Sequence, residues 1–268
     1  MTEVMVLGPL IVVVGGEQVS LGPQTGLLLL VLLLARGRPV SSTRLAELLG
    51  KHDSVQPAPP TLRSHVAHLR RALNQHPAKI SGRPIDYGLV TNRMGNESAY
   101  SFHIDPGQLD MTRFERLVIG GREHMEMGRW HEASTSFNAA LTLWRRRPFS
   151  NVGDRPFAAL EVRRLEALYR LARSVRIEAD MMLGRHREVT AELEVMVTRW
   201  PDDEGLRELL VVCLARAART AEAVQVCREG INVAHSQGLD PFAMDQLITS
   251  LLRAPTTPLH RFSGARLG

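Results

Sequence analysis

The chain has 268 residues, of which 44% are hydrophobic and 23% charged, a composition typical of globular proteins rather than of disordered or fibrous ones. At about 100 to 200 residues per domain, this length predicts two domains. Two cysteines are too few for a disulfide framework, and the longest apolar run, residues 27–34, is shorter than the roughly 18 residues of a membrane span. We therefore expect a cytoplasmic protein that does not contact a membrane.

The net charge of +5 is concentrated in the first part of the chain. Residues 1–104 contain 10 Lys and Arg against 6 Asp and Glu, whereas residues 105–268 contain 23 against 22. This modest excess makes nucleic acid a candidate partner, provided that the same region predicts an element able to enter a groove.

The first 22 residues predict a small antiparallel sheet. Residues 4–7 and 11–14 are β-branched or aliphatic, residues 18–21 alternate, and Gly-Pro and Gly-Gly pairs separate them. A helix is expected after Pro23, ending near Gly37, with four aliphatic side chains at core spacing. These are Leu27, Leu30, Val31 and Leu34.

A second, shorter helix is expected to begin at Ser41 or Ser42 and to end at Gly50. Its apolar stripe consists of Leu45, Leu48 and Leu49. Residues 51–60 contain three prolines and predict a loop.

A third helix is expected to begin near Thr61. Its apolar residues fall at offsets 0, 4, 7 and 11, which makes one continuous stripe. At 100° per residue, the opposite side is available to a partner, with Arg63 and Arg70 on one flank and His65 on the other. The stripe is Leu62, Val66, Leu69 and Leu73, and the opposite side is Ser64, Ala67, His68 and Arg71.

A hairpin is expected next, with strands at residues 88–91 and 99–103 on either side of a turn-rich segment, residues 92–98. Arg93 is the one basic residue from Tyr87 to Tyr100. Strands, three helices and a hairpin in this order predict a winged helix-turn-helix, in which the third helix enters the major groove and the hairpin reaches the backbone or minor groove. A solvated amphipathic helix is the alternative for the third helix taken alone.

From Leu109 onward the pattern is helical, and a motif beginning Gly-Arg repeats. Residues 128–133 match residues 184–189, with a looser copy at residues 218–223. The 34 residues from Glu188 to Glu222 equal the period of tetratricopeptide hairpins, and a helix of more than 20 residues is expected between the first two copies. We expect an all-α tetratricopeptide-like solenoid over residues 105–254 and a flexible tail over residues 255–268.

Several side chains of the helical region are assigned by their spacing. Cys213 and Cys227 lie on apolar faces and are expected to be packed thiols rather than a redox pair, while Trp144 and Trp200 occupy core positions. The three arginines at residues 145–147 are expected to form a solvated turn, with a domain or DNA contact as the alternative.

Seven stretches of this sequence resemble the SARP family, the Streptomyces antibiotic regulatory proteins. They are LGPLIVVVGGEQVSLG, TLRSHVAHLRRAL, IDPGQLDMTRFERL, LWRRRP, LEVRRLEAL, LGRHREV and GLDP. The resemblance implies an OmpR-type winged helix, residues 1–104, joined to a bacterial transcriptional activation domain, residues 105–254. The chain departs from the family where Leu49 replaces a usual Trp and Arg146 a usual Gly.

The resemblance also implies a function. The chain would activate transcription of a specialised-metabolite gene cluster by binding direct repeats in double-stranded promoter DNA, beside a second copy of itself. It would then recruit RNA polymerase through the sigma factor or another subunit. The expected DNA-binding residues are Thr61, Arg63, Ser64, Ala67, His68, Arg70, Arg71 and Arg93.

Other kinds of site are not expected. No catalytic motif occurs, so we expect neither enzymatic activity nor a cofactor. His65 and His68 have His76 nearby, but no cysteine or carboxylate completes a metal site. The alternative function is a protein-interaction scaffold, in which the helical repeats bind a partner and the winged helix does not read DNA.

Overall fold

The computed structural model describes residues 2–50, 62–74, 79–80, 83–84, 88–152 and 155–253. The chain forms two compact units, one of Met1–Val118 with Ala139–Tyr169, the other of Ile119–Asn138 with Arg170–Gly268. The first unit thus extends past residue 104. That residues 1–104 form a domain able to fold alone stays a prediction. Residues 51–61 and 254–268, where a loop, Thr61 and a tail were expected, lie outside the described residues.

The N-terminal sheet is antiparallel, in the order β1 (Thr2–Met5), β2 (Ile11–Val14), β3 (Glu17–Val19). Val4 pairs with Val12, which pairs with Val19, and all three side chains are buried on one face. The first strand begins two residues earlier than expected and ends before Val6, because the Val6 and Leu7 amides bond to a side chain instead of to a strand.

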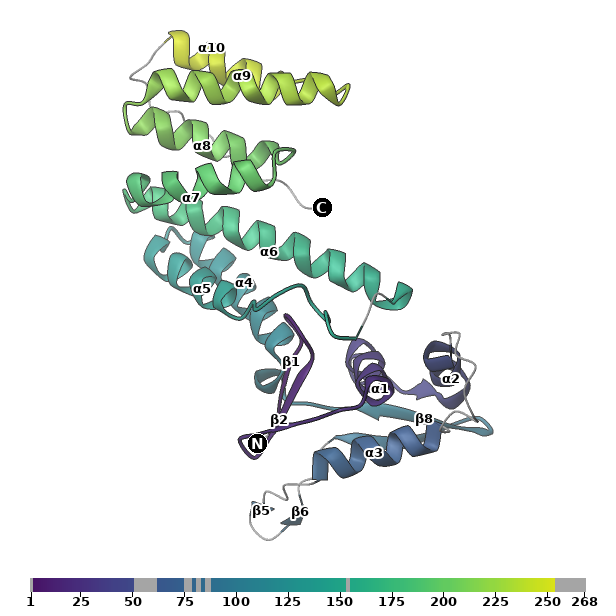
Figure 1. Ribbon diagram of the computed structural model, residues 1–268. Helices are drawn as coiled ribbons and strands as arrows, with labels where there is room; N and C mark the ends of the chain where they lie inside the picture. Colours follow the sequence, from purple (N-terminus) through teal and green to yellow (C-terminus); the bar gives the residue numbers. More distant parts are fainter. Residues whose placement is uncertain are drawn as a thin grey trace. The chain divides into compact units, whose positions relative to one another are not determined.

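Helix α1 (Pro23–Leu34) is buried on all sides, beyond the four residues expected at core spacing, of which Leu34 is only half-buried. Every residue from Thr25 to Leu33 is buried. The helix contacts α2 (Ser42–Gly50), α3 (Leu62–Asn74) and β8 (Glu97–Phe102), which lie next to it in Figure 1. A helix that is apolar around its whole circumference is the kind that forms the centre of a core.

A second sheet has the order β4 (Val40–Ser41), β8, β7 (Leu89–Met94). The hairpin of β7 and β8 is longer than expected, since pairing continues to Met94 opposite Glu97 and leaves only Gly95 and Asn96 in the turn. Gly95 has φ +59°, the left-handed conformation that two-residue hairpin turns require. The segment at residues 92–98 was expected to be a turn because its side chains are polar, but exposed strands carry polar side chains too. A further short pair, β5 (Lys79–Ile80) with β6 (Arg83–Pro84), was not expected.

A segment at residues 145–151, which we call the clasp, follows α5 (Trp130–Thr142) and bonds the loop between β1 and β2 of the first sheet. The Arg145 amide donates to the Leu7 carbonyl at 2.8 Å, and the Asn151 side chain bonds both the amide and the carbonyl of Leu10. The Arg145 guanidinium donates to the Pro9 carbonyl and pairs with Asp110 at 3.4 Å. The three arginines at residues 145–147 are exposed, as expected for a solvated turn, and Arg145 also makes the contact that was the alternative.

Two further groups hold the first unit together. Trp144, expected in the core, is half-buried between the rings of Phe114 and Tyr169, with centroids 5.5 and 4.5 Å away. An ion-pair network joins the end of α1 to the helices α4 (Asp110–Glu126) and α6 (Pro156–Met182). It consists of Arg36, Glu115, Glu161 and Arg164.

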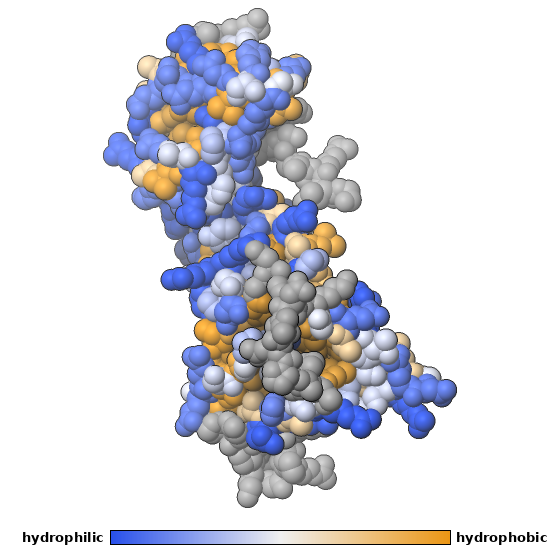
Figure 2. Space-filling model, turned by 45° about the vertical axis from the view of Figure 1, so that its right-hand side comes forward, coloured by the Kyte–Doolittle hydropathy of each residue, from blue (hydrophilic) through white to orange (hydrophobic). Residues whose placement is uncertain are grey.

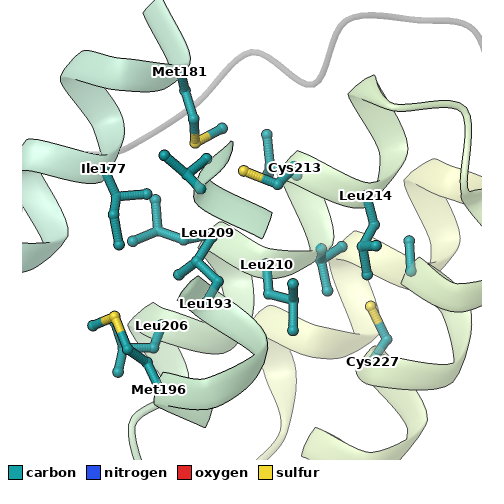
Figure 3. Close-up of a cluster of buried hydrophobic side chains, with 14 of the residues drawn as sticks. Ile177, Met181, Leu193, Met196, Leu206, Leu209, Leu210, Cys213, Leu214 and Cys227 are labelled. Carbon is teal, nitrogen blue, oxygen red and sulfur yellow. The ribbon is translucent and has the colours of Figure 1, made fainter. Parts of the chain in front are cut away.

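The second unit is built of successive helical hairpins, as expected. Figure 1 shows α7 (His186–Arg199), α8 (Glu204–Arg216), α9 (Thr220–Ser236) and α10 (Phe242–Arg253) packed in order. Leu193 and Leu209 are at the centre of its core, together with Cys213 and Cys227 (Figure 3). Both cysteines are free, and burial raises the pKa of each thiol to about 11, which agrees with packed, unreactive thiols.

The turns before α5, α7 and α9 explain the repeated motif. Gly128 and Gly184 have φ +68° and +79°, and Ala218 holds the equivalent place at +60°. Glycine adopts this left-handed conformation without strain, so the repeat marks the end of one helix and the start of the next.

On the face shown in Figure 2, hydrophilic residues cover much of the surface between scattered hydrophobic ones. Within the described ranges, every helix is too short or too polar to span a bilayer.

Adjacent glycines of α4 are expected to respond oppositely to alanine. A Cβ on Gly121 would lie 2.8 Å from the Phe137 ring, whereas one on Gly120 would meet nothing within 4 Å. Gly121→Ala should destabilise the unit by about 1–3 kcal/mol through overpacking, and Gly120→Ala should stabilise it by about 0.5–1 kcal/mol through helix propensity. Urea denaturation of the two variants measures the difference. Equal midpoints would contradict the close packing of α4 at Gly121 against the Phe137 ring of α5.

Candidate nucleic-acid interface

Helix α3 is anchored through one face. Val66, Leu69, Ala72 and Leu73 are buried, and the helix contacts α1 and α2. Leu62, the first residue of the expected stripe, is only half-buried. Because three of the four stripe residues are in the core, the direction in which the rest of the helix faces is set.

The other face of α3 is polar and accessible. Ser64 is half-buried, and the remaining described candidates on this helix are exposed. No acidic residue occurs among Leu62–Asn74, so the arginines are not neutralised from within the helix. The exposed candidates are Arg63, Ala67, His68, Arg70 and Arg71.

His65, on the flank of this face, adds no charge at neutral pH. Burial lowers the pKa of its imidazole below 6.5, and the neighbouring His68 lowers it further. The formal positive charges of the helix are those of Arg63, Arg70 and Arg71.

Arg70 joins the helix to the hairpin. Its guanidinium Nη2 donates to Thr91 Oγ1 on β7 at 2.6 Å. Sequence reasoning placed Arg70 beside Arg71 and missed this contact, because Thr91 is 21 residues away and belongs to another element. Arg70 thus links α3 to the hairpin, whereas Arg63 and Arg71 are exposed positions of α3.

Arg93 is exposed on β7, near the tip of the hairpin, as is the adjacent Met94, with 52% of its surface accessible. Since β7 is the edge strand of the order β4-β8-β7, its outer side is not covered by another strand of that sheet. Arg93 is two residues after Thr91 and so shares its face of the strand, which Arg70 links to α3.

Glu97, which opens β8, holds the hairpin against the start of α2. One carboxylate oxygen accepts from the Thr43 hydroxyl at 2.6 Å, the Thr43 amide at 3.1 Å and the Ser42 hydroxyl at 3.2 Å. These bonds, first that of the Thr43 hydroxyl, lower the pKa of Glu97 and keep it ionised. Sequence reasoning missed this residue, because it lies 54 residues after Thr43 and a capping acid can be recognised in a sequence only when it is close to the helix start.

The arrangement is suited to a polyanion with hydrogen-bonding edges. Guanidinium groups donate in a planar fork that matches phosphate oxygens and the O6 and N7 atoms of guanine, and a helix with one free face fits the major groove. The geometry that was expected, an exposed arginine face on an anchored helix beside a hairpin, is present. The assignment of individual residues to DNA stays a prediction, and Thr61 lies outside the described residues.

Two family models match the chain. The bacterial transcriptional activator domain matches residues 109–247, more than half of the chain, and the C-terminal domain of transcriptional regulatory proteins matches residues 16–83. The chain belongs to the SARP family. The predicted family is thereby confirmed, and with it the winged helix-turn-helix followed by a tetratricopeptide-like helical domain.

Individual relatives of this SARP-family chain are regulators. The regulatory protein AfsR of Streptomyces griseus is 31% identical over 88% of this chain, which spans only 23% of AfsR. The regulatory protein DnrI of Streptomyces peucetius is 28% identical, over 94% of this chain and 92% of DnrI. The structure of Mycobacterium tuberculosis EmbR in complex with a low-affinity phosphopeptide matches with a TM-score of 0.81 and 26% identity, over 94% of this chain and 65% of EmbR.

Proposed function

We propose that this SARP-family chain is a sequence-specific DNA-binding activator of transcription, acting on a specialised-metabolite gene cluster in the bacterial cytoplasm. The observation that carries the proposal is the exposed arginine face of α3, which is free of acidic residues and anchored by Val66, Leu69 and Leu73. Family membership supports regulation of transcription as its purpose. The proposed activity requires no catalytic step and no cofactor.

The arginines are proposed to contact different parts of the DNA. Arg63 and Arg71, with Ser64, Ala67 and His68 between them, face the major groove and read base edges. Arg70, which Thr91 holds between helix and hairpin, is suited to a backbone phosphate at the edge of the groove. Arg93 reaches a phosphate or a narrow minor groove, whose negative potential attracts arginine.

Titrating promoter fragments in a mobility-shift assay tests this division. Arg71→Ala should weaken binding by about 1–3 kcal/mol and relax specificity at one base pair. Arg70→Ala should weaken binding to every sequence alike and lower the slope of log affinity against log salt by about 1. Arg228→Ala, which removes an exposed arginine from α9, is the charge-matched control and should bind as the wild type does. If neither α3 variant changes binding at any salt concentration, α3 does not read DNA.

Footprinting tests the hairpin separately. Arg93→Ala should lose protection on the flank of the major-groove site while it keeps protection within that site. Unchanged flanking protection would remove the hairpin from the interface and leave the assignment of α3 intact.

Activation is proposed to follow from assembly. Two copies bind direct repeats in the promoter, and the helical domain offers surfaces for the neighbouring copy and for RNA polymerase, through the sigma factor or another subunit. The helical hairpins α7 to α10 also fit the alternative function of a protein-interaction scaffold. The mobility-shift assay separates the two, since a scaffold that does not read DNA would not shift any promoter fragment.

A further inference from the structure

A cavity of about 500 Å³ lies in the first unit, where the clasp meets the start of α6. Its size falls within the roughly 300–1,000 Å³ of small-molecule sites. None of its described lining residues is on α3, β7 or β8, so the cavity is distinct from the candidate nucleic-acid interface.

One wall of the cavity is apolar. Phe149, Ala158 and Val162 line it, and each is less than a tenth exposed. Phe149 has φ +59°, a conformation that costs a bulky residue energy and that persists only where its surroundings enforce it. Its amide donates to the Val6 carbonyl at 3.1 Å, so the bond that joins the clasp to the first sheet also holds this wall in place.

The rest of the lining carries an excess of positive charge. Among the described lining residues, Arg147, Arg155 and Arg163 carry guanidinium groups and Glu166 carries a carboxylate, which lies 3.8 Å from Arg147; Arg147 and Arg155 also make other interactions. Arg163 is exposed, one helical turn after the lining residue Ala159. The positive end of α6 adds to this potential, since the helix begins at Pro156 in the cavity lining.

We propose that this cavity binds a small organic anion, a carboxylate or phosphate carried on an apolar body. Guanidinium groups bind both kinds of head group through paired, charge-assisted hydrogen bonds, which explains why arginine lines the polar side. The apolar wall would receive an aromatic or aliphatic body, and a free inorganic anion would leave that wall unused. The proposal does not depend on DNA binding.

A bound ligand would contact the segment that secures the first sheet. Arg147, Phe149 and Ser150 line the cavity, and the neighbouring clasp residues Arg145 and Asn151 bond to Leu7 and Leu10. Because a ligand that binds only the folded state stabilises it, occupancy should raise the melting temperature of this unit.

Isothermal titration of the full chain tests the proposal with four compounds: phenyl phosphate, benzoate, inorganic phosphate and benzyl alcohol. At least one aromatic anion should bind with one-to-one stoichiometry and a Kd of about a few millimolar or tighter, which is what a ligand of this size can reach. Inorganic phosphate and benzyl alcohol should each bind at least about tenfold more weakly, since each uses one side of the cavity. Comparison of phenyl phosphate with benzoate shows which head group is preferred.

Two variants decide whether binding occurs in this cavity. Arg163→Glu reverses a charge of the lining and should weaken binding at least about tenfold. Arg170→Ala removes an exposed arginine farther along α6, outside the lining, and should leave binding unchanged. Circular dichroism establishes that both variants are folded. Equal binding by Arg163→Glu and the wild type, or no binding of either aromatic anion up to about 10 mM, would overturn the proposal.

Discussion

Asp110→Ala is expected to lower the free energy of unfolding of the first unit by about 3–5 kcal/mol. Asp110 is only 4% exposed, and its carboxylate accepts the Val6 amide at 2.7 Å and the Leu7 amide at 3.1 Å. It also pairs with Arg145 of the clasp. Alanine would leave two buried amides without an acceptor and the arginine without its carboxylate. Urea denaturation followed by Trp144 fluorescence, with Trp130 and Trp200 replaced by Phe, reports on this unit alone.

Asp105→Ala provides the matched control. Asp105 is exposed, and among the described residues its carboxylate bonds only the nearby Gly107 amide, at the start of the short 3-10 helix η1 (Pro106–Gln108), so loss of this side chain should cost about 1 kcal/mol or less. Similar costs for the two variants would show that Asp110 does not hold the clasp to the sheet. A fragment of residues 1–104 lacks Asp110, Arg145 and Asn151, and its own urea denaturation tests whether a domain ending there can fold alone.

Inserting about 5 bp between the direct repeats of a bound promoter is expected to abolish cooperative binding and transcription together. Two copies on one face of DNA need repeat centres about 10 to 10.5 bp apart, or a multiple of that, because half a turn rotates one copy to the opposite side. Without contact between copies, each binds with its own affinity and the gain in effective concentration is lost. Footprint titration measures the cooperativity, and transcription in vitro with RNA polymerase measures the output.

Insertion of about 10 bp is the matched control, since it lengthens the site but restores the phase. It should recover part of both the cooperativity and the transcription. Full activation with the half-turn insertion would refute tandem assembly, while binding to a single repeat would still support DNA recognition by α3.

The sequence by itself determined the elements whose pattern is local. The offsets of Val66, Leu69 and Leu73 predicted the anchored face of α3, and the structure buries all three. The repeated motif at Gly128 and Gly184 predicted the helical hairpins, because a left-handed turn between helices selects glycine. The exposed positions on α3 followed from the same periodicity, since residues that the stripe does not bury must face outward.

Only the tertiary structure decided which residues meet across long separations. Arg70 bonds Thr91, Glu97 caps α2 from 54 residues away, and Asp110 bonds amides more than 100 residues before it. The structure likewise decided between the alternatives left open for Arg145, whose guanidinium donates to the Pro9 carbonyl. Helical and strand periods record which side of an element is buried, but they do not record what covers it, so the hairpin contact, the clasp and the cavity beside it became visible only when the elements were packed.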